Sequence, residues 1–419
     1  MPAHSSGCGK GVWCLLICAA KSNEQVDLSV NASEMRPNVA AQHSGRRVLM
    51  VAPAGQGGTL QYTHNLCEAL CDAGHQVVLA TAVDCEINSF PRRYQLLGVF
   101  DRFRPRFGPL LRFVRMIRQT KPEIIHLQGA QRPEFFWLLL AVVSRLCSAR
   151  FVWTPQDVVS NSSKRYHPWM QRRNYARMSH VFLNAKQNET AVREMFKVPH
   201  NKITVMAIPD LLVFARRDLG RSLPPELTWT PDSAPLILCF GLIEPRKGIA
   251  QLIQAFGQLA DSTDARLLII GKPLTDIAPY RAAIAALALE PGRLQIIDRY
   301  ASFEEMNGLF EASTVVVLPY LNGWNSGVLA SGFGFGKPVV ATRVGGFDEV
   351  IVDGETGLLV PPDDADALAD ALRRVIEDDI LRSKLETGAK AESARLSWQE
   401  IAATTSRIYD EILEDPDNE

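Results

Sequence analysis

The segment between residues 315 and 362 limits the fold more strongly than any other part of the chain. Residues 315–318 form a continuous apolar run of strand length, and Pro319 ends it. A stretch rich in small residues, 326–336, leads to a second β-branched run at 338–341. The pattern predicts a strand, a loop, a helix and a second strand in succession, which is typical of a parallel sheet.

The loop before the predicted helix has the features of a phosphate site. At the carboxyl end of a parallel strand, a ligand meets the amino terminus of the next helix, where backbone N–H groups lack partners. Such a site can hold a diphosphate without a metal ion. We therefore expect four consecutive residues to bind the phosphate-bearing part of a ligand: Asn325, Ser326, Gly327 and Val328.

Short β-branched runs alternate with helical patterns along the rest of the chain, which predicts an α/β fold with two doubly wound parallel sheets. In the first half we expect strands at 48–52, 77–80, 124–127, 151–154, 181–183 and 203–206. In the second half we expect them at 236–240, 267–270, 294–297, 315–318 and 339–341. Between the halves, residues 216–235 contain several prolines and no periodicity, so they form the predicted linker.

Composition agrees with a globular protein of two domains. The 419 residues are too many for one core, and 47% of them are apolar and 22% charged. A net charge of −1 gives no electrostatic case for nucleic-acid binding. The 8 cysteines include no CxxC pair and no histidine at zinc spacing. We therefore expect no metal, no other cofactor and a reduced, cytoplasmic location.

The first residues of the chain differ in character from the rest. The apolar run at 11–20 follows Lys10, as in a signal segment, but it is shorter than the roughly 20 residues that a membrane helix needs. We expect residues 1–45 to be a disordered segment outside the fold, with a targeting role as the alternative. The longest other apolar run, 135–143, is also too short to span a membrane.

Five segments occur in an order typical of one enzyme family. They are 48–59 with its GQGGT turn, FGLIEPRKG at 240–248, DRYASFEEM with VVVLPY at 298–320, the glycine-rich 344–364, and LSWQEIAATTSRIYDEIL at 396–413. Together they resemble the retaining glycosyltransferases of family 4, which have the GT-B fold. The resemblance spans residues 47–413.

This resemblance implies two Rossmann-like domains that face a central cleft. We expect an acceptor-side domain at 46–213, a linker at 214–234, and a nucleotide-sugar-binding domain at 235–395. A last helix at 396–415 is expected to cross back to the first domain.

The resemblance also assigns roles to charged and glycine residues. Lys247 matches the family's phosphate-contacting lysine, and Arg246 beside it is the second residue that we expect to be catalytic. Both are expected at the start of a helix, where its positive dipole end adds to their charge. Fixed positive groups of this kind stabilise the diphosphate that leaves in the transition state. Gly57 and Gly58 match the family's glycine pair and are expected to contact the donor.

Several positions depart from the family's pattern. Leu242 stands in place of a usual arginine, and Gly323 and Ser331 stand in place of two glutamates. Losing a charge-assisted hydrogen bond typically costs on the order of 1.5–3 kcal/mol. The sequence NSGVL at 325–329 resembles a variant motif in part of the family, so Asn325 and Ser326 would supply the donor contacts instead.

Two positions in the first domain concern proton transfer. Gln156 occupies a place where the family usually has histidine, and glutamine can donate and accept hydrogen bonds only. The leaving phosphate can take the acceptor's proton, so this change need not abolish turnover. His126 resembles the family's histidine at a strand end, and we interpret it as a structural residue.

The segment 101–122 mixes seven basic residues with apolar residues at helical spacing. It predicts a basic amphipathic helix, which can dock on an anionic membrane near a lipid-linked acceptor. The alternative is an ordinary surface helix whose apolar face lies in the core.

The resemblance and the motifs predict a hexosyltransferase. It would use a UDP- or GDP-sugar without a metal, retain the anomeric configuration, and act on a glycan, a lipid-linked acceptor or a small molecule in glycoconjugate or polysaccharide biosynthesis. We expect it in the cytoplasm or at the cytoplasmic face of the membrane. The alternative is a noncatalytic GT-B subunit that binds nucleotide or a partner glycosyltransferase, which the missing glutamates and histidine would allow.

Overall fold

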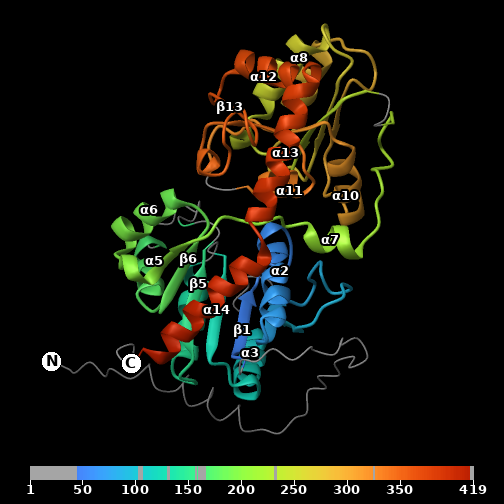
Figure 1. The fold of residues 1–419 in the computed structure, drawn as a ribbon. Coiled ribbons are helices and arrows are strands. Elements are labelled where there is room, and N and C mark those ends of the chain that lie inside the picture. The colour runs from blue at the N-terminus through green and yellow to red at the C-terminus, as the bar shows by residue number, and fades with distance from the viewer. Residues whose placement is uncertain are drawn as a thin grey trace, which may run out of the picture.

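Two parallel sheets, each covered by helices, form the molecule (Figure 1). The computed structural model describes residues 45–101, 107–129, 133–155, 158, 167–230, 234–323 and 326–415. The prediction for the N-terminal 45 residues therefore falls almost entirely outside the described residues. The predicted pair of doubly wound parallel sheets is confirmed.

The first sheet has seven strands in the order β3-β2-β1-β4-β5-β6-β7. Its strands are β1 (Arg47–Ala52), β2 (Gln76–Ala82), β3 (Gln95–Phe100), β4 (Ile124–Gln128), β5 (Arg150–Thr154), β6 (His180–Leu183) and β7 (Ile203–Val205). Its helices are α2 (Gly58–Asp72), α3 (Phe107–Thr120), α4 (Pro133–Val143), α5 (His167–Tyr175), α6 (Lys186–Phe196) and the 3₁₀ turn η2 (His200–Lys202).

The second sheet has six strands in the order β10-β9-β8-β11-β12-β13. Its strands are β8 (Leu236–Phe240), β9 (Arg266–Ile270), β10 (Leu294–Ile297), β11 (Val315–Leu318), β12 (Val339–Thr342) and β13 (Leu358–Val360). Its helices are η4 (Pro245–Lys247), α8 (Ile249–Ala260), α9 (Ala278–Ala286), α10 (Phe303–Ala312), α11 (Gly327–Gly334), η5 (Phe347–Glu349), α12 (Ala365–Glu377) and α13 (Asp379–Arg395).

The continuous apolar runs in the sequence arise because each sheet is buried on both faces. Along β1, Val48 and Met50 pack into one core cluster, while Leu49 and Val51 pack into the cluster on the opposite face. The residues of β8 divide in the same way between the two clusters of the second domain. A strand in this environment has no polar face, so it shows no alternation of apolar and polar residues.

Two strands escaped the sequence-based prediction, and both are edge strands. The strand β3 has four half-buried or exposed residues before its buried end, so its sequence shows no clear apolar run. The strand β13 has only three residues, and it pairs with β12 alone. Edge strands have one neighbour to bury them, which weakens the sequence signal on which the prediction depends.

The predicted linker contains structure at its start. The short helix α7 (Val213–Asp218) lies between the two sheets in Figure 1. Its Phe214 and Ala215 are buried in a core cluster of the second domain, as is Trp229 farther along. The sequence lacked a periodic pattern here because a helix of six residues makes less than two turns. The domain boundaries themselves stay predictions.

The last helix, α14 (Trp398–Glu414), lies across the first domain rather than the second (Figure 1). Trp398 and Tyr409 are buried in the same core cluster as residues of β1 and α2. Trp398 Nε1 donates a hydrogen bond of 2.8 Å to the Asp210 carbonyl, and Arg46 Nε pairs with Asp410 at 2.8 Å. The end of the chain is thereby held against its beginning.

His126 of β4 joins this helix to the sheet. Its Nδ1 lies 2.7 Å from the Tyr409 hydroxyl, and its Nε2 lies 2.7 Å from the Thr154 hydroxyl. Burial lowers the pKa of His126 to about 3, so the ring is neutral when folded. Both ring nitrogens are satisfied within the core, which agrees with the structural interpretation of this residue.

We expect the protein to lose stability as the pH falls below about 6.5. Burial also lowers the pKa values of His64 and His180 to about 4, whereas unfolded histidine binds a proton near pH 6.5. Between these values only the unfolded state takes up protons, so each buried histidine removes about 1.4 kcal/mol of stability per pH unit. The check is the thermal midpoint measured from pH 7.5 to 5.

Replacing one of these histidines distinguishes the effect of histidine protonation from other causes of lower stability in acid. The His126→Gln variant should show a shallower decline with pH, while His200→Gln, at an exposed position, should follow the unaltered protein. A midpoint that stays constant over this range would contradict the expectation.

Candidate active site

A cavity of about 510 Å³ lies where the two domains meet. The first domain contributes the start of α2 and residues 208, 211 and 212, and the second contributes loops that follow β8, β9 and β11. The strands β8 and β11 are neighbours at the point where the strand order of the second sheet reverses. In open α/β sheets, ligands bind at this reversal, outside the carboxyl ends of the strands.

Most of the site residues predicted from the sequence line this one cavity. They are Gly57, Gly58, Arg246, Lys247, Ser326, Gly327 and Val328. Asn325 and Gln156 lie outside the described residues. Segments that are far apart in the chain are therefore brought together, and the binding roles of these residues stay predictions.

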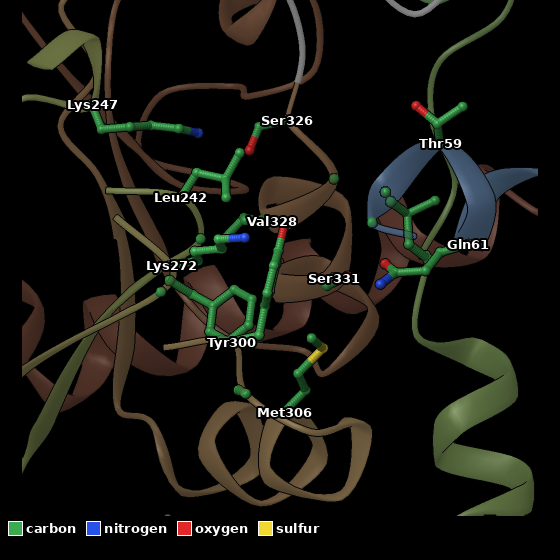
Figure 2. Close-up of a pocket in the computed structure, with 18 of the residues that line it drawn as sticks. Thr59, Gln61, Leu242, Lys247, Lys272, Tyr300, Met306, Ser326, Val328 and Ser331 are labelled. Carbon is green, nitrogen blue, oxygen red and sulfur yellow. The ribbon is translucent and has the colours of Figure 1, made fainter. Parts of the chain in front are cut away.

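Lys247 is held beside the start of α11. Its Nζ lies 3.6 Å from the centre of the buried Tyr320 ring, and the Tyr320 hydroxyl lies 3.1 Å from Ser326 Oγ. An ammonium over an aromatic face is attracted by the ring's negative face, which fixes its position. Figure 2 shows Lys247 and Ser326 pointing toward one another at the edge of the cavity.

The amino terminus of α11 adds positive character at the same place. Ser326 is the N-cap residue, yet its side chain accepts no hydrogen bond from the helix amides. The first amides of a helix have no intrahelical partner, and together with the helix dipole they attract an anion. The lysine and this helix start are therefore a suitable pair for a diphosphate.

The loop that carries Arg246 and Lys247 is fixed by a close backbone contact. Gly248 has a φ of 66°, and a Cβ at this position would lie 1.7 Å from the Pro319 carbonyl oxygen. The Leu321 amide donates a hydrogen bond of 2.8 Å to the Arg246 carbonyl. Only glycine lets the loops after β8 and β11 approach this closely.

The glycine pair at the start of α2 is already engaged by a carboxylate. The Gly57 amide donates a hydrogen bond of 2.8 Å to Glu86 Oε1, and Gly57 has a φ of 81°. Burial raises the pKa of Glu86, although this amide opposes the shift. A ligand that used the Gly57 amide would have to compete with Glu86.

The sequence analysis missed a third cation in the cavity. Lys272 follows β9, and its Nζ lies 5.6 Å from the centre of the Tyr300 ring. The Ile243 amide donates to the Lys272 carbonyl at 3.0 Å, so the loop with this lysine pairs with the residue that follows Leu242, the position where the family usually has arginine. The signal was the Gly271–Lys272 pair directly after a predicted strand, at the edge where the other loops converge.

Other missed residues come from α2 of the first domain. Figure 2 shows Thr59 and Gln61 across the cavity from Ser331 and Val328. The sequence analysis singled out Gly58 at the start of α2 but gave no reason to add Thr59 or Gln61. Only the approach of the second domain makes these side chains part of a site.

Among the described residues, no group of three or more histidine, cysteine, aspartate or glutamate side chains is placed to hold a metal ion. None of the helices in this part of the chain combines the length and apolar character needed to cross a bilayer.

Comparison with known families decides the identity of the fold. Residues 234–378 match the family model described as glycosyl transferases group 1, and residues 57–209 match the glycosyl transferase 4-like domain. The chain belongs to glycosyltransferase family 4. The resemblance stated from the sequence is confirmed, including the GT-B fold.

Two relatives of this glycosyltransferase illustrate the match. It is 34% identical over 213 residues to a D-inositol 3-phosphate glycosyltransferase of a Nocardioides species. The aligned residues make up 48% of this chain and 46% of the relative. It is 27% identical over 390 residues to a phosphatidyl-myo-inositol mannosyltransferase of Mycolicibacterium smegmatis, which covers 87% of this chain and 94% of the relative.

Solved structures of similar fold are more distant in sequence. Sucrose-phosphate synthase of Thermosynechococcus elongatus has a TM-score of 0.68 at 21% identity, over 88% of this glycosyltransferase and 99% of that chain. Anabaena HepE in complex with UDP-glucose has a TM-score of 0.68 at 17% identity, over 85% and 98% of the two chains. These likenesses show the fold alone.

The positions that depart from the family's glutamates also line the cavity. Ser331 is buried in α11. The buried Asp210 carboxylate of the segment between the domains lies 2.5 Å from Arg216 Nη2. Burial raises the pKa of Asp210, and the Arg216 charge opposes this shift. Gly323 offers only its backbone.

We expect Gly248→Ala to disrupt the glycosyltransferase at the loop that carries Arg246 and Lys247. A left-handed backbone costs an alanine roughly 1–2 kcal/mol, and the overlap with Pro319 forces the loops apart. The free energy of unfolding should fall by about 2 kcal/mol or more. Gly220→Ala is the matched control, because a Cβ there meets nothing within 4 Å. Equal denaturation midpoints for both variants would contradict this role.

Proposed function

We propose that this glycosyltransferase transfers a hexose from a UDP- or GDP-sugar to a hydroxyl acceptor with retention of anomeric configuration. The observation that carries the proposal is the convergence of the Lys247 ammonium and the α11 amino terminus on one cavity. Breaking the bond between sugar and diphosphate increases the negative charge on the leaving group. Positive groups fixed in advance stabilise that charge as it develops.

The cavity also has the right composition around the proposed diphosphate. It is bounded by apolar and aromatic side chains of the second domain, among them Phe240, Met306 and Phe310. Charged side chains, among them Glu244, Lys247 and Lys272, line the same cavity. In a ligand site the apolar walls exclude water, and the polar groups set the orientation of the ligand. The acceptor would enter from the side of α2, where Thr59 and Gln61 lie (Figure 2).

We propose an inositol-containing or lipid-linked acceptor. Support comes from the names of two relatives, an inositol 3-phosphate glycosyltransferase and a phosphatidyl-myo-inositol mannosyltransferase. The acceptor hydroxyl would lose its proton to the leaving diphosphate, so the site needs no separate basic side chain for this step.

The direct test is release of nucleoside diphosphate from a panel of UDP- and GDP-sugars, with inositol phosphates and phosphatidylinositol as acceptors. Release that depends on one donor and one acceptor would support the enzyme. Binding of a nucleotide sugar without release would favour the noncatalytic subunit, and absence of binding would overturn both.

Lys247→Ala should weaken donor binding while leaving the fold intact. A charge-assisted hydrogen bond contributes about 1.5–3 kcal/mol, which corresponds to about a 10- to 150-fold loss in affinity. Calorimetry with UDP and GDP measures the loss, and the thermal midpoint checks the fold. Lys384→Ala, on the exposed surface of α13, is the matched control. Unchanged affinity in Lys247→Ala would remove its assigned role.

We propose that α3 brings the protein to an anionic membrane through charge. Its Phe113, Met116 and Ile117 are buried in the core of the first domain, so this apolar face is not free for lipid. Arg118 and Leu111 remain on the exposed side. The helix therefore resembles an ordinary surface helix in its packing, and any docking would depend on its arginines.

Flotation with acidic vesicles tests this docking. We expect binding at low salt that is lost at high salt, because surface charges are screened. The Arg115→Gln/Arg118→Gln double variant should bind less, and Lys384→Gln should bind as the unaltered protein does. Binding that ignores salt, or no binding at all, would count against a role of α3.

A further inference from the structure

Arg246 lies against Gly323, the residue that stands in place of the first of the family's two glutamates. A Cβ on Gly323 would lie 3.5 Å from Arg246 Nη1 and 3.6 Å from Tyr320 Cδ2. The Arg246 guanidinium therefore lies against the space that a side chain at position 323 would fill. It enters this space from the loop after β8, whereas Gly323 belongs to the loop after β11.

Arg246 brings a carboxylate with it. Glu244 Oε1 lies 2.6 Å from Arg246 Nη2, and the side chains are 20% and 36% exposed. This oxygen is buried, and its contact with Arg246 lacks the geometry of a hydrogen bond. Both side chains line the cavity. A buried carboxylate oxygen without a hydrogen bond is unusual, since such groups normally find a donor.

We propose that the Glu244 carboxylate, held in place by Arg246, binds hydroxyl groups of the transferred sugar and takes part in sugar selection. This inference rests on the proposed function. Each carboxylate oxygen has two lone pairs, so Oε2 can accept hydrogen bonds from sugar hydroxyls while Oε1 faces Arg246. It would supply the acceptor group that neither Gly323 nor Ser331 offers in this chain.

The position of the pair relative to Lys247 agrees with the connectivity of a nucleotide sugar. Lys247 Nζ lies over the face of Tyr320, and Arg246 lies beside the same ring at Gly323. The proposed diphosphate and sugar subsites are thus neighbours, as they must be when a single bond joins the two parts of the donor. Because Glu244 neutralises Arg246, the diphosphate charge falls mainly to Lys247 and the α11 amino terminus.

The test compares ligands with and without the sugar. Calorimetry would measure the affinities of UDP and GDP, and of the nucleotide sugars, for the unaltered protein, Glu244→Gln and the exposed control Glu377→Gln. We expect Glu244→Gln to bind the nucleotide sugar at least about tenfold more weakly while its affinity for the nucleoside diphosphate changes less than about threefold. The control should match the unaltered protein.

Donors that each lack one sugar hydroxyl distinguish a direct contact of Glu244 with the sugar from an indirect effect on the loop. The unaltered protein should bind at least one of these deoxy-sugar donors about tenfold more weakly than the complete donor. Glu244→Gln should bind that donor and the complete donor equally. If Glu244→Gln weakens the binding of the nucleoside diphosphate and of the nucleotide sugar equally, or still discriminates between the donors, the role of Glu244 is overturned and the proposed function stands. If the unaltered protein binds neither ligand, the proposed function fails and this assignment fails with it.

Discussion

The close approach of the loops after β8 and β11 is the constraint on which the site depends. Gly248 lies against the Pro319 carbonyl, and the Leu321 amide bonds to the Arg246 carbonyl. These contacts place a cationic loop beside the start of α11 at the reversal point of the sheet. Because the contact is between backbones, the side chains of Arg246 and Lys247 can line the cavity, where Arg246 pairs with Glu244 and Lys247 lies over Tyr320.

A second constraint joins the two domains. The chain leaves the first domain near Asp210, builds the second, and returns through α14, whose Trp398 bonds to the Asp210 carbonyl. His126, Tyr409 and Thr154 then form a buried polar chain between this helix and the sheet. Buried polar groups are stable only when fully paired, so these contacts specify one placement of α14. Because both domains line the cavity, its shape depends on that placement of α14.

The distribution of charge shows why a site cannot be judged one position at a time. In sequence, Leu242, Gly323 and Ser331 look like losses from the family's pattern. In space, Lys272 pairs through its carbonyl with the residue after Leu242, and Arg246, the partner of Glu244, lies against Gly323. The side chains that line this cavity come from several loops, so a group lost from one loop can be replaced from another without any trace at the original position.

The sequence by itself determined the fold class and each central strand, and most of the site residues predicted from it line the cavity. It could do so because buried parallel strands need continuous apolar runs and because close loops need glycine, and both leave local marks. It did not reveal β3, β13, α7, Lys272 or Glu244. Edge strands and short helices have weak periodicity, and a side chain joins a site through neighbours distant in the chain. Only the packing of the two sheets and the return of α14 decided those neighbours.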